Sequence, residues 1–255
     1  PMTQPNHLPA VVPASGGALT TTPGAQRIAT RMADDLLAVA HSRERALAAQ
    51  RRYRIGKYEF READHAQIQR WAQMLDIGPE DVVEGLEKSK KIWKFGGRID
   101  VNFHVQDGHI VSLAWDFDTF PLTDWAWGDG LKIERLGILE PEEELCIFLR
   151  RLPTLPRCLR ELFCYGCKLT HLDLTLVSGL TKLDCSDNPL TKLDLTALPG
   201  LTKLDCSGNH RLTHLDLTPV PGLTELRCSF NRLAQLDLTP VPGLTKLDCS
   251  GNPLA

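Results

Sequence analysis

The second half of the chain repeats itself at a nearly constant interval. The segment 180–188 recurs at 201–209, 223–231 and 244–252, so the period is 21, then 22, then 21 residues. The extra residue of the longer unit lies within 209–212. A unit this short cannot bury its own apolar face, so each copy must stack on its neighbours. The repeats therefore predict a solenoid. The length of the repeated segment then reflects the number of turns and not a number of globular domains.

Within each unit, apolar and polar residues alternate as in a strand with one buried face. Leu183 and Cys185 alternate with Lys182 and Asp184, and the matching residues of the other copies form columns. We expect the strands of successive units to pair in parallel, about 4.8 Å apart. The asparagine of each unit, such as Asn188, is expected to turn inward and to hydrogen-bond backbone groups at the bend.

An earlier copy of the unit spans 159–169 and carries Cys167 in the asparagine position. Together the copies resemble the leucine-rich repeat family, whose units follow LxxLxLxx(N/C)xL, and the Pro-Gly turns look like those of bacterial members with 21-residue repeats. The resemblance covers 159–255. It implies an α/β solenoid, a right-handed coil with a parallel sheet, and a protein-recognition scaffold that binds its partner on the concave face of that sheet.

The sequence predicts four segments. Residues 1–25 contain no Asp, Glu, Lys or Arg and should form a disordered leader. Residues 26–97 should form a helical N-terminal module, with helices over 24–54, 64–75 and 79–94. Residues 98–158 should hold a hairpin that turns at Asp107-Gly108, then degenerate first repeats and a short helix over 141–152. Regular repeats fill 159–255, and the last leucines would lack a cover, so we expect a C-terminal truncation.

The N-terminal module has two interpretations. It can cap the apolar first turn of the solenoid, as such an array requires. Alternatively, 67–86 resembles a helix-turn-helix, with Ala72, Ile77 and Val82 near its core positions, which would make the protein a nucleic-acid-binding regulator. The second helix of that motif is acidic, with Glu80, Asp81, Glu84 and Glu87. Acidic groups repel phosphates, and the formal net charge of the chain is −3, so we expect no nucleic-acid partner.

The sequence shows no motif of a catalytic, cofactor or metal site. Glycine-rich phosphate loops and nucleophile elbows are absent from it. Cys164 and Cys167 form a CxxC pair, but Cys164 aligns with the cysteine of every other unit, which favours buried thiols over zinc. We therefore expect no enzyme activity, no metal and no cofactor in this segment. The alternative is a larger bacterial effector or signalling enzyme whose catalytic domain lies beyond residue 255.

The cysteines and the leader bear on location. Eight cysteines without a secretory signal favour reduced thiols in a cytoplasm. The longest apolar runs are shorter than the roughly 18–20 residues of a membrane span, so we expect no membrane association. An uncharged leader is also typical of effectors exported by bacterial secretion machines, which leaves secretion as the alternative.

Residues that point outward from the strands are the candidates for partner binding. Departures from the repeat consensus are the most informative, because aromatic residues and arginine dominate interface hot spots. We expect a protein partner to contact Phe163, Tyr165, Lys182, Asp184, Lys203, Asp205, Glu225, Arg227, Phe230, Lys246 and Asp248. An alternative for Phe163 and Tyr165 is that they pack under the N-terminal module.

Overall fold

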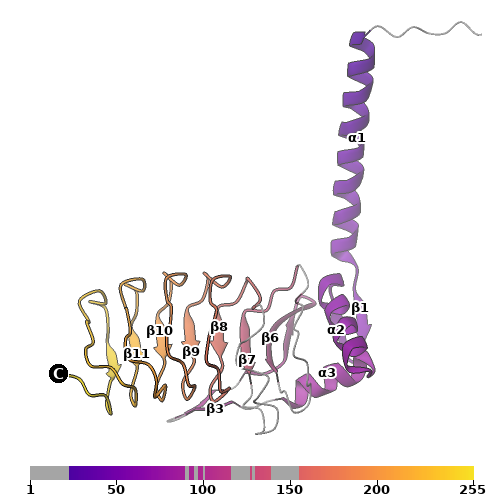
Figure 1. Ribbon diagram of the computed structural model, residues 1–255. Coiled ribbons are helices and arrows are strands. Elements are labelled where there is room, and N and C mark those ends of the chain that lie inside the picture. The colour runs from indigo at the N-terminus through magenta and orange to yellow at the C-terminus, as the bar shows by residue number, and fades with distance from the viewer. Residues whose placement is uncertain are drawn as a thin grey trace, which may run out of the picture. The chain divides into compact units, whose positions relative to one another are not determined.

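The computed structural model of the chain describes residues 23–89, 92–94, 97–99, 101–115, 127, 130–138 and 155–255 (Figure 1). The chain divides into two compact units, Pro1–Ala48 and Ala49–Ala255. The helix expected over 141–152 and residues 1–22 of the expected leader lie outside the described residues.

Helix α1, Pro23–Gln50, accounts for the described part of the first unit. It begins at a proline, whose fixed φ suits the first turn of a helix. The expected end at residue 54 is wrong, because Tyr53–Ile55 forms strand β1, which pairs antiparallel with β2, Tyr58–Phe60. This hairpin turns at Gly56, whose φ of 56° lies in the left-handed region that glycine favours.

An eight-stranded sheet runs through the second unit in the order β12-β11-β10-β9-β8-β7-β6-β5. Its strands are β5 His104–Gln106, β6 His109–Trp115, β7 Arg135–Ile138, β8 Glu161–Phe163, β9 Lys182–Asp184, β10 Lys203–Asp205, β11 Glu225–Arg227 and β12 Lys246–Asp248. Neighbours from β6 to β12 pair in parallel, which confirms the predicted solenoid (Figure 1). β5 pairs antiparallel with β6 across Asp107 and Gly108, whose positive φ values confirm the predicted turn.

The expected asparagine contacts are present at the bends. Nδ2 of Asn188 donates to the carbonyls of Cys164 and Cys185, at 2.8 and 3.0 Å, and its Oδ1 accepts from the amide of Leu169 at 2.9 Å. Asn188 is 2% exposed, so these bonds satisfy backbone groups that burial removes from water. Two of the three bonds join one turn of the solenoid to the next.

The longer unit changes this pattern at Asn231. Its Nδ2 still donates to the carbonyls of Cys206 and Cys228, at 3.1 and 2.8 Å. The amide that would reach its Oδ1 belongs to Leu212, which instead donates to the carbonyl of Asn209 at 2.8 Å. Oδ1 of Asn231 therefore has no hydrogen-bond partner among the described residues. The extra residue explains the loss, because it shifts Leu212 away from its position in the other turns.

A row of threonine hydroxyls, each just before a strand, runs along the solenoid. Oγ1 of Thr202 donates to the carbonyl of Thr181, Oγ1 of Thr224 to that of Thr202, and Oγ1 of Thr245 to that of Thr224, each at 3.0 Å. Oγ1 of Thr181 donates in the same way to the carbonyl of Arg160 at 3.1 Å. Each of these hydroxyls thus binds the turn that precedes it.

The helices of the second unit pack against the first strands of the sheet. They are α2, Glu62–Leu75, and α3, Pro79–Lys88. The ring of Trp71 lies 5.0 Å from that of Trp115 at 60°, and Oδ1 of Asp64 accepts the amide of Ile110 at 2.9 Å. Buried residues of both helices join one core with those of β6 and β7. This packing supports the interpretation that the module caps the first turn.

Two details of the N-terminal module differ from the prediction. The helix expected over 79–94 ends at Lys88, because Ile92–Lys94 forms β3 and pairs antiparallel with β4, Gly97–Ile99. Ile77 was expected near the core of a helix-turn-helix, but it is 40% exposed in the bend between α2 and α3. The acidic side chains of α3, Glu80, Asp81, Glu84 and Glu87, lie partly or fully at the surface, as the sequence suggested.

Candidate functional site

One column of charged side chains runs across the parallel sheet from strand to strand. The strand register places Arg135, Glu161, Lys182, Lys203, Glu225 and Lys246 side by side in that order. Glu161 accepts from Nε of Arg135 at 2.9 Å and from Nζ of Lys182 at 2.7 Å. Glu225 in the same way binds Nζ of Lys203 at 2.6 Å and Nζ of Lys246 at 3.1 Å. The column therefore consists of two carboxylates, each between two cations.

Glu161 is the more buried of these two carboxylates, with a side chain 16% exposed against 27% for Glu225. Burial alone would raise the pKa of Glu161, but the hydrogen bond from Lys182 and the charge of Arg135 outweigh it and lower the pKa. Hydrogen bonds from Lys203 and Lys246 lower the pKa of Glu225 as well. Both carboxylates are thus held in the charged form that pairs with their neighbours.

A second column, formed in the strand register by Phe163, Asp184, Asp205, Arg227 and Asp248, is covered at its start. Phe163 is 6% exposed and packs in a small cluster with Val101 and Ala114. Asp184 is 2% exposed, and its Oδ1 accepts from the hydroxyl and the amide of Ser186 at 2.5 and 3.2 Å. Asp205 is 6% exposed. These three residues were expected to face solvent, and they are buried instead.

Farther along the same column the surface opens. The side chain of Arg227 is 49% exposed, with Nη1 4.0 Å from Oδ2 of Asp205. Asp248 on the last strand is exposed, and a hydrogen bond from Ser250 lowers its pKa. Lys246 is exposed, whereas Lys182, Lys203 and Glu225 of the first column are half-buried. The accessible charges therefore gather toward β11 and β12.

Phe230 is the exposed aromatic residue of this region, with 57% of its surface accessible. Its φ is 54°, a conformation that side chains with a Cβ adopt rarely. The matching positions of neighbouring turns are glycines with positive φ, Gly208 and Gly251. The ring of Phe230 lies over Gly251, where a Cβ atom would come within 2.7 Å of Cδ1. An aromatic side chain is thus displayed at a position where glycine would be the unstrained choice.

Tyr165 lies on an earlier turn and is half-buried. It hydrogen-bonds to Asp187, one turn on, whose φ is 53°. Burial raises the pKa of Asp187, although the bond from Tyr165 and the charge of His210 oppose this shift. Tyr165 is therefore not packed away as Phe163 is, and it stays a partner-contact candidate.

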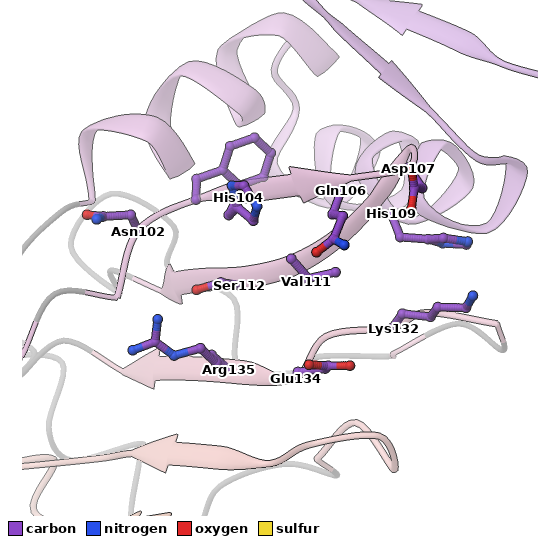
Figure 2. Close-up of a pocket in the computed structure, with 11 residues that line it drawn as sticks. Asn102, His104, Gln106, Asp107, His109, Val111, Ser112, Lys132, Glu134 and Arg135 are labelled. Carbon is purple, nitrogen blue, oxygen red and sulfur yellow. The ribbon is translucent and has the colours of Figure 1, made fainter.

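A hollow of about 550 Å³ adjoins the first strands of the sheet (Figure 2). It is lined by Asn102, Phe103, His104, Gln106, Asp107, His109, Val111, Ser112, Lys132, Glu134 and Arg135. Ser112 pairs with Arg135 in the strand register, so the hollow continues the charged column. Nδ1 of His109 lies 2.8 Å from Oδ2 of the buried Asp64, which fixes its ring at the edge of the hollow.

Sequence reasoning did not anticipate this hollow. Its side chains come from β5 and the residues just before it, from the turn and β6, and from the start of β7 with the residues that lead into it. Figure 2 shows Lys132, Glu134 and Arg135 following one another below the β5–β6 hairpin. A cluster of polar residues around the Asp107-Gly108 turn was the one available signal. Oγ of Ser112 is buried here without a hydrogen-bond partner among the described residues.

The cysteines behave as core residues. All seven within the described residues are free thiols, and Cys164, Cys185, Cys206 and Cys228 are fully buried in one column. Burial raises the pKa of Cys164 and Cys206 well above the ordinary value and raises that of Cys228 to about 12. Within the described part of the chain, no three His, Cys, Asp or Glu side chains gather as metal ligands would.

Four aspartates, one on each of four successive turns, have a local role. Oδ1 of Asp173 accepts from the amide and the hydroxyl of Thr175 at 3.0 and 2.7 Å, and Asp194, Asp216 and Asp237 make the same pair of bonds with Thr196, Thr218 and Thr239. Each carboxylate thus closes its own turn.

The comparison with protein families decides what the repeats are. The model "Leucine Rich repeats (2 copies)" matches residues 178–219. These two turns are leucine-rich repeats. With the parallel sheet of the second unit, they make the fold a leucine-rich-repeat solenoid, an architecture that typically serves as a scaffold for protein–protein interaction.

One solved structure that matches part of the chain bears the description "Functional domain of InlJ from Listeria monocytogenes includes a cysteine ladder". The identity is 27% and the TM-score 0.34, and the match covers 47% of this chain and 35% of that one. The chain thus spans about a third of the length of this structural neighbour. Curated proteins gave no significant match. Among the described helices, none is long and apolar enough to cross a membrane.

Proposed function

We propose that the chain recognises a protein partner with the concave face of its solenoid, and that the contact centres on β11 and β12. The observation that carries this proposal is Phe230, an exposed aromatic residue in a left-handed conformation. Backbone strain of this kind persists only where the surrounding structure holds it, and it gathers at functional sites. The next turn supplies that support, because Gly251 leaves room for the ring.

Arg227 adds the second element of the contact. It lies on the strand that precedes Phe230 on the same turn, and about half of its side chain is accessible. Arginine and aromatic residues together are the usual centre of a protein interface. Around them we place Lys246, Asp248, Glu225, Lys203 and Lys182 as polar rim, with Tyr165 as an outlying contact. Phe163, Asp184 and Asp205 are left out of this contact, because they are buried.

The charged column suggests how the partner is selected. Most charges of the column already pair with one another within the sheet. A partner that merely carries an excess of positive or negative charge therefore gains little binding energy from them. An aromatic anchor with arginine beside it instead favours a partner with an apolar pocket and an acidic rim. The repeats are, in this proposal, of the bacterial type with 21 residues, and the reduced thiols suit a cytoplasmic protein.

The test measures how strongly three variants of the chain bind a protein partner that the wild-type chain captures. Phe230→Ala and Arg227→Ala should each weaken binding of a captured partner by more than about tenfold, as hot-spot truncations do. Leu176→Ala is the matched control, because Leu176 is also an exposed apolar residue, 45% accessible, but lies between β8 and β9, on a different turn from Arg227 and Phe230. Binding that survives both concave-face substitutions would show that this surface is the wrong one.

A further inference from the structure

Helix α1 carries a stripe of large apolar side chains. Met32, Leu36, Val39 and Leu47 are 60%, 69%, 65% and 56% exposed. At about 100° per residue they fall on one side of the helix. The described residues of the first unit are this helix, so among them no second element covers the stripe. A lone helix is marginally stable in water and normally depends on packing of its apolar face.

The stripe has the spacing of a coiled-coil seam. Met32, Leu36, Val39, Arg43 and Ala46 follow one another at intervals of 4, 3, 4 and 3 residues. Alternating steps of three and four keep a seam facing a second helix. The seam is short and contains one charge, Arg43, so a partner helix must accommodate a guanidinium near its apolar side chains.

A second copy of α1 can accommodate this guanidinium in one of its two orientations. When two copies run antiparallel with Leu36 of one opposite Val39 of the other, Met32 faces Arg43. Arg43 then lies beside Asp35 of the second copy. Asp35 directly precedes Leu36 in the sequence and lies at the edge of the seam. Within one helix, Arg43 and Asp35 are eight residues or about 12 Å apart, so they do not satisfy each other. In a parallel pair of helices, Arg43 of one helix would instead face Arg43 of the other.

We propose that α1 pairs with α1 of a second copy of the chain as an antiparallel two-helix coiled coil. The two-fold axis passes between the Leu36–Val39 layers and creates two equivalent Arg43–Asp35 pairs, as expected of an isologous dimer. The dimer joins two chains through their N-terminal helices. This inference does not rest on the proposed function.

The experiment measures the mass of the full chain by light scattering and sedimentation equilibrium over a range of concentrations. The wild-type chain should be a dimer. Leu36→Glu should weaken the dimer by more than about tenfold, because it places a charge in the seam. Leu37→Glu is the matched control: Leu37 is 55% exposed but projects about 100° away from Leu36, so that variant should remain a dimer. Circular dichroism confirms that both variants keep the helix.

A charge exchange tests the orientation. Arg43→Asp should weaken the dimer, since it places a new carboxylate of one copy next to Asp35 of the other. The double variant Asp35→Arg with Arg43→Asp should restore it to near the wild-type affinity. A monomeric wild-type chain, a dimer that tolerates Leu36→Glu, or an equal loss in Leu37→Glu would overturn the proposal. Failure of the double variant to restore pairing would overturn the antiparallel arrangement, and binding of a monomer to lipid vesicles would assign the stripe to a membrane surface.

Discussion

The ring of Phe230 lies against Gly251, the residue that occupies the same position one turn later. Cδ1 of the ring would be 2.7 Å from a Cβ atom at that glycine. The two residues therefore form one arrangement, in which the absence of a side chain on the last turn allows an aromatic side chain on the turn before it.

Replacement of Gly251 by alanine should disturb both residues. The new methyl group would push the ring aside, and the φ of 68° at Gly251 disfavours a residue with a Cβ. We expect a loss of about 1 kcal/mol in the free energy of unfolding, measured by urea denaturation, and weaker partner binding. Gly243→Ala is the control, because a Cβ there meets no atom within 4 Å. Equal effects of the two substitutions would contradict the arrangement.

Replacement of Phe230 by glycine should separate stability from binding. Glycine removes the strain of the left-handed conformation, so we expect the free energy of unfolding to rise by about 1 kcal/mol while partner affinity falls. Phe230→Ala should lose binding without the gain in stability, since alanine keeps a Cβ at the same φ. If glycine proved as destabilising as alanine, packing of the ring rather than strain would dominate at this position.

The asparagines at the bends should not be equivalent. Asn188→Ala removes the partner of the Leu169 amide and of the Cys164 carbonyl, while the carbonyl of Cys185 still accepts from Nδ2 of Asn209. Asn231, in contrast, makes no bond through Oδ1 that a substitution could remove. A buried backbone group left unsatisfied costs about 1–3 kcal/mol. We therefore expect Asn188→Ala to lower the free energy of unfolding by at least about 1 kcal/mol more than Asn231→Ala. Thermal and urea unfolding of the two variants, side by side, would check this difference.

The Glu161 cluster should contribute to stability in a pH-dependent way. The pKa of Glu161 in the folded chain lies below its ordinary value of 4.5, so the unfolded chain takes up the proton first as pH falls. The contribution is fully present above pH 4.5 and is lost as pH falls through the folded pKa. In acid titrations of urea stability, Glu161→Gln should flatten this part of the profile, and Lys182→Met should do the same. An unchanged acid limb in both variants would show that the ion pairs add nothing.

The thiols should differ in reactivity according to their depth. Cys164, Cys206 and Cys228 have raised pKa values because they are buried, and the thiolate is the reactive form. With iodoacetamide at neutral pH, the half-buried Cys249 should be labelled first and the buried column only after denaturation. Mass spectrometry of the labelled peptides reads out each site. Rapid labelling of Cys206 in the native chain would mean that the stack opens locally.

The sequence predicted the regular turns because their determinants are local. The period and the alternation of Leu183 and Cys185 with polar neighbours are visible within a single unit, and they fix strand, register and bend. The same logic failed for Phe163, since alternation assigns a side chain to a face and says nothing about what covers that face. The cover here is Val101, which is 62 residues away in the chain.

Other features were missed for lack of any repeating signal. The hairpin of β1 and β2 has strands of three residues each, too short to establish a pattern after a long helix. The hollow beside Ser112 combines segments that only the fold brings together. The burial of Asp184 depends on a hydrogen bond from the neighbouring Ser186, and composition alone marks both residues as polar.

The threonine hydroxyls that donate backward from turn to turn give the solenoid a chemical direction. If the last turn, which carries β12, were removed, the hydroxyls of Thr181, Thr202 and Thr224 would keep their acceptors. If the turn that carries β8 were removed, Thr181 would lose its acceptor, the carbonyl of Arg160. Each turn therefore offers its backbone carbonyls to the turn that follows it in the chain. Synthesis on the ribosome also proceeds in this direction, so each new turn meets acceptors on a turn that is already present.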